Sequence, residues 1–426
     1  MTASDTTTTQ GELEKLVSDL RGLLANKDLD AVPEIKLLRQ RLDDGMHNVR
    51  ESAVRAAQAE VRGAEAEQAR LKAGEYEYGL RLATQRRAIE GGPTHQEWSA
   101  GLERGLRLTS KADLDARIGE QGVLEAGEKV GDARHEAARQ LLGLWYGARS
   151  SALETRLWRE QGRLLEGQMR IVETRVKRGD AARLDTYQAE AALAQARSQA
   201  AAAEAREKAA LAELAARFPE LPAPAESEAL PVLPEGDAAS WLAHTLEHNH
   251  ELLAASRALE KARLLVRRAE ADQRPDPTLG LHLASEQGGK DRIVGISVAL
   301  PLPGEGRRAQ ADLRLAQAQV QAEMEAATRR RLTAEAGANW QRAAAGVESW
   351  RRLEEAAQAI GRHADLARRA NALGELGLSD TLLARRAALD ARLAAGQARL
   401  AANEAIARLL LDAHRLWPLG DDDEHH

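Results

Sequence analysis

The chain lacks cysteine and has few aromatic residues: only 3% of its 426 residues are aromatic, and it has a single phenylalanine, Phe218. Without cysteine there can be no disulfides, zinc–thiolate sites, cysteine nucleophiles or lipid-modified cysteine. With so few large apolar side chains, a thick conventional core is not expected. No apolar run approaches the roughly 18 residues that a membrane-spanning helix needs.

Charged residues of both signs are abundant, and they are mixed along the sequence. The 60 basic and 66 acidic residues are interspersed and give a net charge of -6, so there is no basic field for nucleic acid. Ala, Leu, Glu, Arg and Gln dominate, which is typical of long helices and coiled coils. The first ten residues lack the charged start and apolar stretch of a secretory signal, so the sequence as written carries no export signal.

The sequence contains an internal duplication. His47-Asn48 matches His248-Asn249 at an offset of 201 residues, and the segment that starts at Tyr78 matches the one at Leu279 at the same offset. Beyond the strands the offset is 195, as between Gly179 and Gly374. The change falls in a connection between two strands, where insertions are tolerated. We therefore expect two related halves, each with the same order of elements.

The expected organisation follows from this duplication. A helical extension that is partly disordered covers residues 1–46, and an acidic tail covers residues 418–426. A linker with five prolines, residues 218–237, separates the repeats. The first repeat, 47–217, comprises a helix, strands at about 75–89 and 95–108, a long helix at about 111–176, a turn and a return helix. The second repeat, 238–417, has strands at about 277–287 and 291–302 and a long helix at about 307–371.

Each repeat has two segments in which apolar and polar residues alternate. Leu80 and Leu82 alternate with charged or small residues, as do Leu281 and Leu283 in the second repeat. A period of two predicts strands with one apolar face. Such strands fit either the wall of a membrane barrel around water or a small sheet of two hairpins packed on helices. Aromatic residues near the strand ends, such as Tyr78 and Trp98, favour the barrel.

The long helices do not fit an ordinary globular domain. No proline interrupts residues 111–176 or 307–371, so each helix would extend for roughly 100 Å. Leu157, Leu164 and Ile171 recur every seven residues and predict the seam of a coiled coil. At the far end of each helix a glycine, Gly179 or Gly374, predicts a reversal, and Asp or Ser is expected to cap the returning helix.

This order of parts resembles the outer-membrane efflux channels, the TolC-like family, over residues 40–417. The segment 97–104 resembles the family's second strand, and segment 294–303, with its Pro-Leu-Pro exit, resembles the fourth. The turns after Gly179 and Gly374 resemble the tips of the family's two helical hairpins. The resemblance leans toward the heavy-metal and cation efflux branch. Residues 11–46 differ from the family's usual N-terminus and resemble short helical proteins of the ElaB type.

The resemblance implies a mainly helical fold with a small β part. Long antiparallel coiled-coil helices would form an α-barrel, and four strands per chain would contribute to a 12-strand β-barrel in a homotrimer. The trimer would lie in outer-membrane lipid, with a periplasmic extension. It would be a passive duct that docks a periplasmic adaptor (a membrane fusion protein) and an inner-membrane efflux pump. The competing hypothesis is a soluble coiled-coil scaffold without transport activity.

Two groups of residues would carry this function. The first group would dock the adaptor and gate the channel at the hairpin tips: Gly179, Leu184, Asp185, Gly374, Leu378, Ser379, Asp380. The second group would face lipid from the strands: Tyr78, Leu80, Leu82, Trp98, Leu102, Leu279, Leu281, Leu283, Val294, Ile296, Val298. Plain N-capping is the alternative role for Asp185 and Asp380.

No enzyme chemistry is expected, and no cofactor or metal. His244, Glu247, His248 and His250 lie close together in sequence, and two of these histidines have the i, i+4 spacing of a helical metal pair. We interpret them as the solvated start of a helix that begins near Ala238. Gly304-Glu305-Gly306 lacks the Lys-Ser/Thr of a phosphate-binding loop and is interpreted as a turn from strand to helix.

Overall fold

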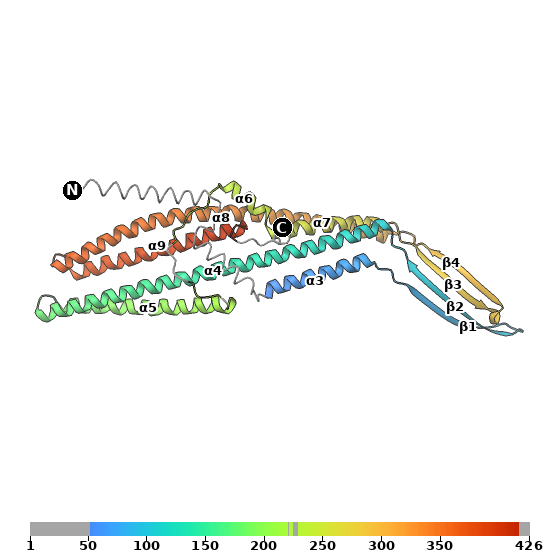
Figure 1. Cartoon of the computed structure of the whole chain (residues 1–426), viewed down its shortest axis with the longest axis horizontal. Helices are drawn as coiled ribbons and strands as arrows, with labels where there is room; N and C mark the ends of the chain where they lie inside the picture. The colour runs from blue at the N-terminus through green and yellow to red at the C-terminus, as the bar shows by residue number, and fades with distance from the viewer. Residues whose placement is uncertain (1–51, 220, 225–228, 417–426) are drawn as a thin grey trace, which may run out of the picture. The chain divides into compact units, whose positions relative to one another are not determined.

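The computed structural model describes residues 52–219, 221–224 and 229–416 (Figure 1). The extension expected at 1–46 and the acidic tail expected at 418–426 lie outside the described residues. The described chain is mainly helical with one four-stranded sheet, which confirms the expected fold class. Its elements are α3 Ser52–Ala73, β1 Gly79–Ala88, β2 Thr94–Gly105, α4 Thr109–Arg178, α5 Arg183–Arg217, α6 Ala238–Glu247, α7 His250–Ala271, β3 Thr278–Glu286, η2 Gln287–Gly289, β4 Asp291–Ala299, α8 Glu305–Leu373 and α9 Leu378–Asp412.

The duplication is visible in this order, because α3–β1–β2–α4–α5 repeats as α7–β3–β4–α8–α9. The helix at the start of the second repeat differs from the prediction. The helix expected to start near Ala238 is two helices, because Asn249 ends the first and caps the second: its side chain accepts a hydrogen bond from the Leu252 N–H at 2.9 Å. The strands are shorter than expected by one to four residues at most ends.

The compact units of the chain do not coincide with the repeats. Unit 1 combines residues 134–248 with 333–416 among the described residues, and unit 2 combines 52–133 with 249–332. The borders fall inside α4 and α8. Each unit therefore contains equivalent segments from both repeats.

Unit 1 is a set of helices around an apolar core. Trp145, Trp158 and Phe218 are buried there together with alanines and leucines of α5 and α9. Beside this core the buried carboxylate of Asp412 accepts hydrogen bonds from Arg139 at 2.9 Å and from Asn339 at 2.7 Å. A buried carboxylate is tolerated because these partners compensate for its lost hydration.

The coiled-coil seam of α4 is not the predicted one. Leu157 is buried, but Leu164 and Ile171 are exposed. The buried seven-residue series lies one position further along the helix: Trp158, Leu165, Val172. Facing helix α5 buries a series of small residues with the same spacing: Ala189, Ala196, Ala203. The sequence has leucine at both 164 and 165, so the spacing alone fitted two registers, and only the packed partner distinguishes them.

Unit 2 contains the sheet, which is antiparallel throughout with strand order β1-β2-β3-β4. The β1–β2 hairpin and the β3–β4 hairpin come from different repeats and are joined by pairing of β2 with β3. Alanine-rich helix α3 and helix α4 approach closely at Gly119, where an added Cβ would lie 2.8 Å from the side chain of Gln68. A larger residue there would force the two helices apart.

Candidate functional site

The register of the sheet places its apolar residues in rows on one face. Leu80 pairs with Leu102, Leu102 with Leu281, and Leu281 with Ile296. Directly paired residues point to the same side of a sheet, so this row crosses all four strands. Leu82, Ala100, Leu283 and Val294 form the next row in the same way.

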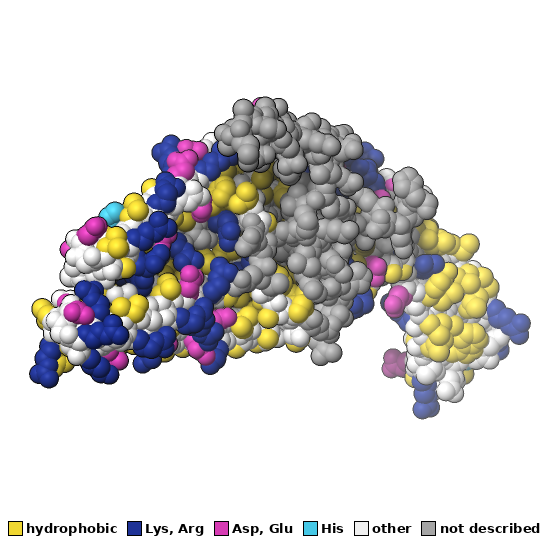
Figure 2. All heavy atoms as spheres, turned by 60° about the vertical axis from the view of Figure 1, so that its left-hand side comes forward, with side chains coloured by type: hydrophobic (Ala, Val, Ile, Leu, Met, Phe, Trp, Pro, Cys, Tyr) yellow, Lys and Arg dark blue, Asp and Glu magenta, His cyan; other side chains and the backbone are white. Residues whose placement is uncertain are grey.

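This apolar face is exposed in the chain. Leu80 is 69% exposed and Ile296 is 79% exposed, although both are large aliphatic residues in strands. By register and exposure the same face carries ten of the eleven residues expected on it: Leu80, Leu82, Trp98, Leu102, Leu279, Leu281, Leu283, Val294, Ile296, Val298. The eleventh, Tyr78, precedes β1 and is exposed. Figure 2 shows hydrophobic side chains gathered over this part of unit 2, at the right. A contiguous apolar surface of this kind marks a site of contact with lipid or protein.

The opposite face of the sheet is polar and holds cross-strand ion pairs. Arg81 pairs with Glu103 at 3.2 Å, and Arg87 pairs with both Glu97 and Glu286 at 3.2 Å. Glu97 is buried among these side chains, whereas Arg81 is exposed. The sheet is thus divided into one apolar face and one charged face.

A polar cluster holds the base of the sheet, next to the start of β3. The carboxylate of Asp276 accepts hydrogen bonds from the Tyr76 hydroxyl at 2.9 Å and the Leu108 N–H at 3.2 Å, and it pairs with the buried Lys111 at 3.0 Å. Burial acts to raise the pKa of the Asp276 carboxyl, but these partners outweigh it and hold that pKa below its usual value. No local sequence pattern indicates this cluster, because its members lie far apart in the chain.

The first hairpin tip joins α4 to α5. Gly179 has a φ of +81°, and its N–H donates to the carbonyl of Val176 at 3.0 Å. The next N–H, that of Asp180, donates to the carbonyl of Arg175 at 2.8 Å. This pair of bonds is the Schellman motif, which needs a left-handed residue and so explains the glycine.

The second tip, between α8 and α9, repeats this geometry. Gly374 also has a φ of +81°, and its N–H donates to the carbonyl of Asn371 at 3.1 Å. Here the turn is fixed further by two buried side chains: the Asn371 amide donates to the carbonyl of Leu376 at 2.8 Å, and the Thr381 hydroxyl donates to that of Gly377 at 3.0 Å. Asn371 and Thr381 were not predicted, since a single polar residue in a helix carries no signal of burial.

The expected caps of the returning helices are wrong. The N-cap residues are Ala182 and Gly377, and neither makes a side-chain cap hydrogen bond. Asp185 and Asp380 lie instead in the first turn of α5 and α9. There a carboxylate stabilises the helix through its dipole, worth about 0.3–1 kcal/mol at an exposed site.

The tip residues differ in accessibility. Leu184 is 63% exposed, and Ser379 and Asp380 are exposed as well. Leu378, by contrast, is buried against Val172 of α4 and Ala189 of α5. Leu378 therefore holds the two hairpins of unit 1 together and offers no surface for a partner.

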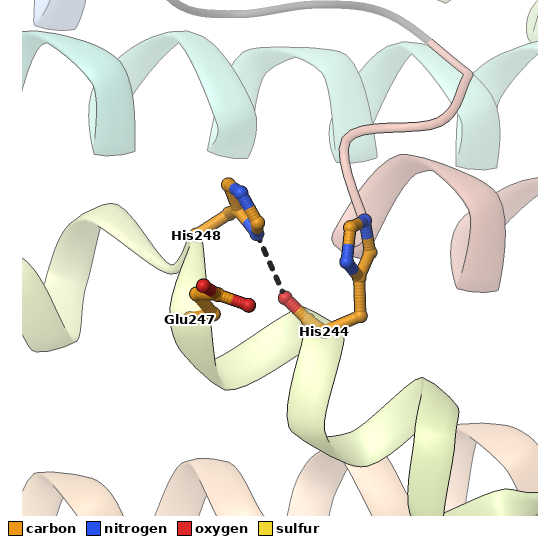
Figure 3. Close-up of side chains that lie close together, drawn as sticks. All are labelled: His244, Glu247 and His248. Atoms are coloured by element: carbon orange, nitrogen blue, oxygen red, sulfur yellow. Dashed lines mark hydrogen bonds between the residues drawn. The ribbon is translucent and has the colours of Figure 1, made fainter.

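The histidine segment also takes a definite arrangement (Figure 3). His244 and Glu247 lie in the last turn of α6, His248 is its C-cap residue, and their possible ligand atoms lie within 4.8 Å of one another. Burial, followed by the neighbouring His248, lowers the pKa of His244. His250 does not join them; its Nδ1 lies 2.9 Å from a carboxylate oxygen of Glu128, within unit 2.

Among the described helices, none has an apolar stretch long enough to cross a membrane.

Comparison with known proteins gives a partial sequence match and extensive structural ones. A family model described as the DUF883 N-terminal domain matches residues 7–59. No curated protein matches the chain. A membrane protein from Pseudomonas aeruginosa is similar with a TM-score of 0.76 at 18% identity, over 91% of this chain and 92% of that one.

Two further solved structures have a similar fold. The CmeC outer membrane channel of Campylobacter jejuni has a TM-score of 0.72 at 15% identity, over 90% of this chain and 87% of its own. The outer membrane protein VceC of Vibrio cholerae has a TM-score of 0.71 at 16% identity, over 88% of this chain and 96% of its own. The chain has the fold of the TolC-like outer-membrane efflux channels.

Proposed function

We propose that this chain is one of three identical subunits of a passive exit duct in an outer membrane. The observation that carries the proposal is the four-stranded sheet, whose apolar face is exposed and whose edges are open. Within the part of the chain that the structure describes, β1 and β4 form these edges and are bonded to a strand on one side only. Open edges and an exposed apolar face are both unfavourable in water.

Three copies of the sheet would remove both problems. Pairing β4 of one copy with β1 of the next would close a barrel of twelve strands, which leaves no edge. The strands contain 9 to 12 residues, which matches the roughly 9–11 residues that a tilted strand needs to cross a bilayer. The apolar face would then meet lipid, and the face with Arg81 and Glu103 would line a water-filled interior.

The competing scaffold hypothesis needs the same leucines to pack on helices. A sheet packed in that way would bury Leu80 and Leu281 on one face, yet Leu80 is 69% exposed and Leu281 is 45% exposed. These values favour the duct.

The hairpin tips are the proposed end for docking and gating. The exposed residues Leu184, Ser379 and Asp380, together with the half-buried Asp185, would contact a periplasmic adaptor or the tips of neighbouring copies, and Gly179 and Gly374 would shape the reversals. The duct would be passive, so the energy for transport would come from the inner-membrane pump.

The test is the mass of the full chain by size-exclusion chromatography with light scattering, with and without mild detergent. We expect a species of about 139 kDa of protein, three times the 46.3 kDa chain, that depends on detergent. That trimer should then conduct ions in a planar bilayer. A single monomeric species that stays in solution without detergent, and does not conduct, would favour the scaffold.

A further inference from the structure

The end of α6 carries a cluster of metal-binding side chains that the duct does not require. His244 and His248 are four residues apart, and Glu247 lies between them in the last turn of the helix. Histidines at i and i+4 lie on one side of a helix, so one ion can contact both. The three possible ligand atoms lie within 4.8 Å of one another, so small rotations of the side chains would bring them to the ligand spacing of a bound ion (Figure 3).

The local hydrogen bond determines which nitrogen of His248 is available. Its Nδ1 lies 3.1 Å from the carbonyl oxygen of His244, and a carbonyl oxygen can only accept a hydrogen bond. Nδ1 must therefore carry the proton, which leaves the lone pair of the neutral ring on Nε2. A hydrogen bond from one ring nitrogen to a backbone carbonyl is the usual way in which proteins orient a metal-binding histidine.

The surroundings add a further histidine to the cluster. The ring of His414, just beyond the end of α9, has its centroid 6.1 Å from that of His248. All four residues belong to unit 1. The site is accessible, because His248 and Glu247 are exposed and His244 is half-buried.

We propose that His244, Glu247 and His248 bind one divalent late-transition-metal ion, of the class of Zn²⁺, Cu²⁺ or Ni²⁺. Two imidazoles and one carboxylate suit this class, whereas Mg²⁺ and Ca²⁺ prefer oxygen ligands alone. Three protein ligands leave a position for water or for His414. The site does not depend on the proposed duct, since a soluble scaffold with these residues would bind the ion equally.

The duplication predicts a single site per chain. At the offset of 201 residues, His248 corresponds to His47, but His244 and Glu247 correspond to Asp43 and Met46. Of the three equivalent positions only position 47 has a histidine, and Met46 stands where the site has Glu247, so the set of two histidines and one glutamate is not repeated. A chain with one site should bind one ion.

The experiment is calorimetric titration of the full chain with zinc chloride. Because the sequence ends in His425-His426, both are replaced by alanine in every protein that is tested. The reference protein should bind one ion per chain with a Kd in the micromolar range or tighter. The double variant His244→Ala/His248→Ala should bind at least about 10-fold more weakly, since even the loss of an outer-shell partner costs 10–100-fold. Glu247→Gln should weaken binding less.

Two controls separate loss of ligands from loss of fold. His363→Ala removes an exposed histidine of α8 elsewhere in unit 1 and should leave zinc binding unchanged. Circular dichroism in chelator should give the same melting temperature for the double variant and the reference. With Cu²⁺ in place of zinc, electron paramagnetic resonance should detect two nitrogen ligands in the reference protein. Equal zinc affinity in the double variant and the reference, or no zinc binding by the reference, would overturn the proposal.

Discussion

A charge placed on the apolar face of the sheet tests the duct most directly. Leu281 lies in the row that crosses all four strands, between Leu102 and Ile296. If this face meets lipid, Leu281→Arg places a guanidinium near the middle of the bilayer. Such a substitution costs about 2–4 kcal/mol at the midplane, or about 30- to 1,000-fold in the insertion equilibrium per chain. A trimer would contain three of these charges, so its assembly should fail more severely than one chain suggests.

The adjacent residue provides a matched control. His282 follows Leu281 in β3 and points to the opposite face, where its paired residues are Gly101 and Gly295. Those glycines have no side chain, so an arginine at 282 has room and would face water in the barrel interior. His282→Arg adds the same charge one position away and should insert normally.

The assay is flotation of the refolded proteins with lipid vesicles, followed by urea titration of the fraction that inserted. We expect Leu281→Arg to remain largely outside the vesicles or to unfold at lower urea, and His282→Arg to behave as the unmodified chain. Equal insertion of both variants would refute the assigned face. Poorer insertion of His282→Arg than of Leu281→Arg would mean that the sheet is inverted.

Three further predictions concern the helices. Asp380→Ala should raise bilayer conductance by loosening the closed tip, and unchanged conductance would leave Asp380 with only its role at the start of α9. Gly374→Ala should cost about 1–2 kcal/mol in urea unfolding, because φ is +81° there and no atom lies close enough to clash, so only the backbone resists; an unchanged urea midpoint would contradict this. Hydrogen bonds from Lys208 and Arg159 lower the pKa of Glu204 from its ordinary 4.5 to about 2, so the stability they add is present above pH 4.5 and is lost as the pH falls toward 2. The melting temperature of Glu204→Gln should accordingly lie slightly below that of the unmodified chain at pH 6 and match it near pH 2; a constant difference would exclude this linkage.

The features that could be predicted from the sequence are those with a local pattern. Alternation of apolar residues predicted the strands and the side of each strand on which Leu80, Leu281 and Ile296 lie, because the period of two needs no knowledge of the partner strand. Glycine predicted both reversals, since a left-handed residue is required there.

The features that failed depend on a packed partner or on the residue at which a backbone changes direction. The seam of α4 was placed one residue early because leucine occupies both 164 and 165, and only the alanines of α5 select between them. The caps were misplaced because Asp185 and Asp380 are two residues beyond the first residues of their helices, Arg183 and Leu378. Sequence spacing does not reveal which residue is the last with extended backbone.

The arrangement of the histidine cluster was also only partly predictable from the sequence. The spacing of His244 and His248 was visible in the sequence, but a continuous helix from Ala238 was expected. The structure ends α6 at Glu247 with His248 as its C-cap residue, and the His248 Nδ1 lies 3.1 Å from the carbonyl oxygen of His244. His414 joins from the end of α9, which no local pattern could indicate.

The duplication alone would have placed the fourth strand on the wrong side of the sheet. Beyond the strands the repeats match at an offset of 195, which would align Leu102 with Ser297. In the sheet, however, Leu102 and Ile296 occupy the same row, at an offset of 194. A slip of one residue moves every side chain of a strand to the other face, so the offset of 195 would put Ser297 and Gly295 among the leucines. The apolar pattern of β4 is thus a better guide to its register than the offset between the repeats, and that is the behaviour expected of a strand whose two faces meet different surroundings.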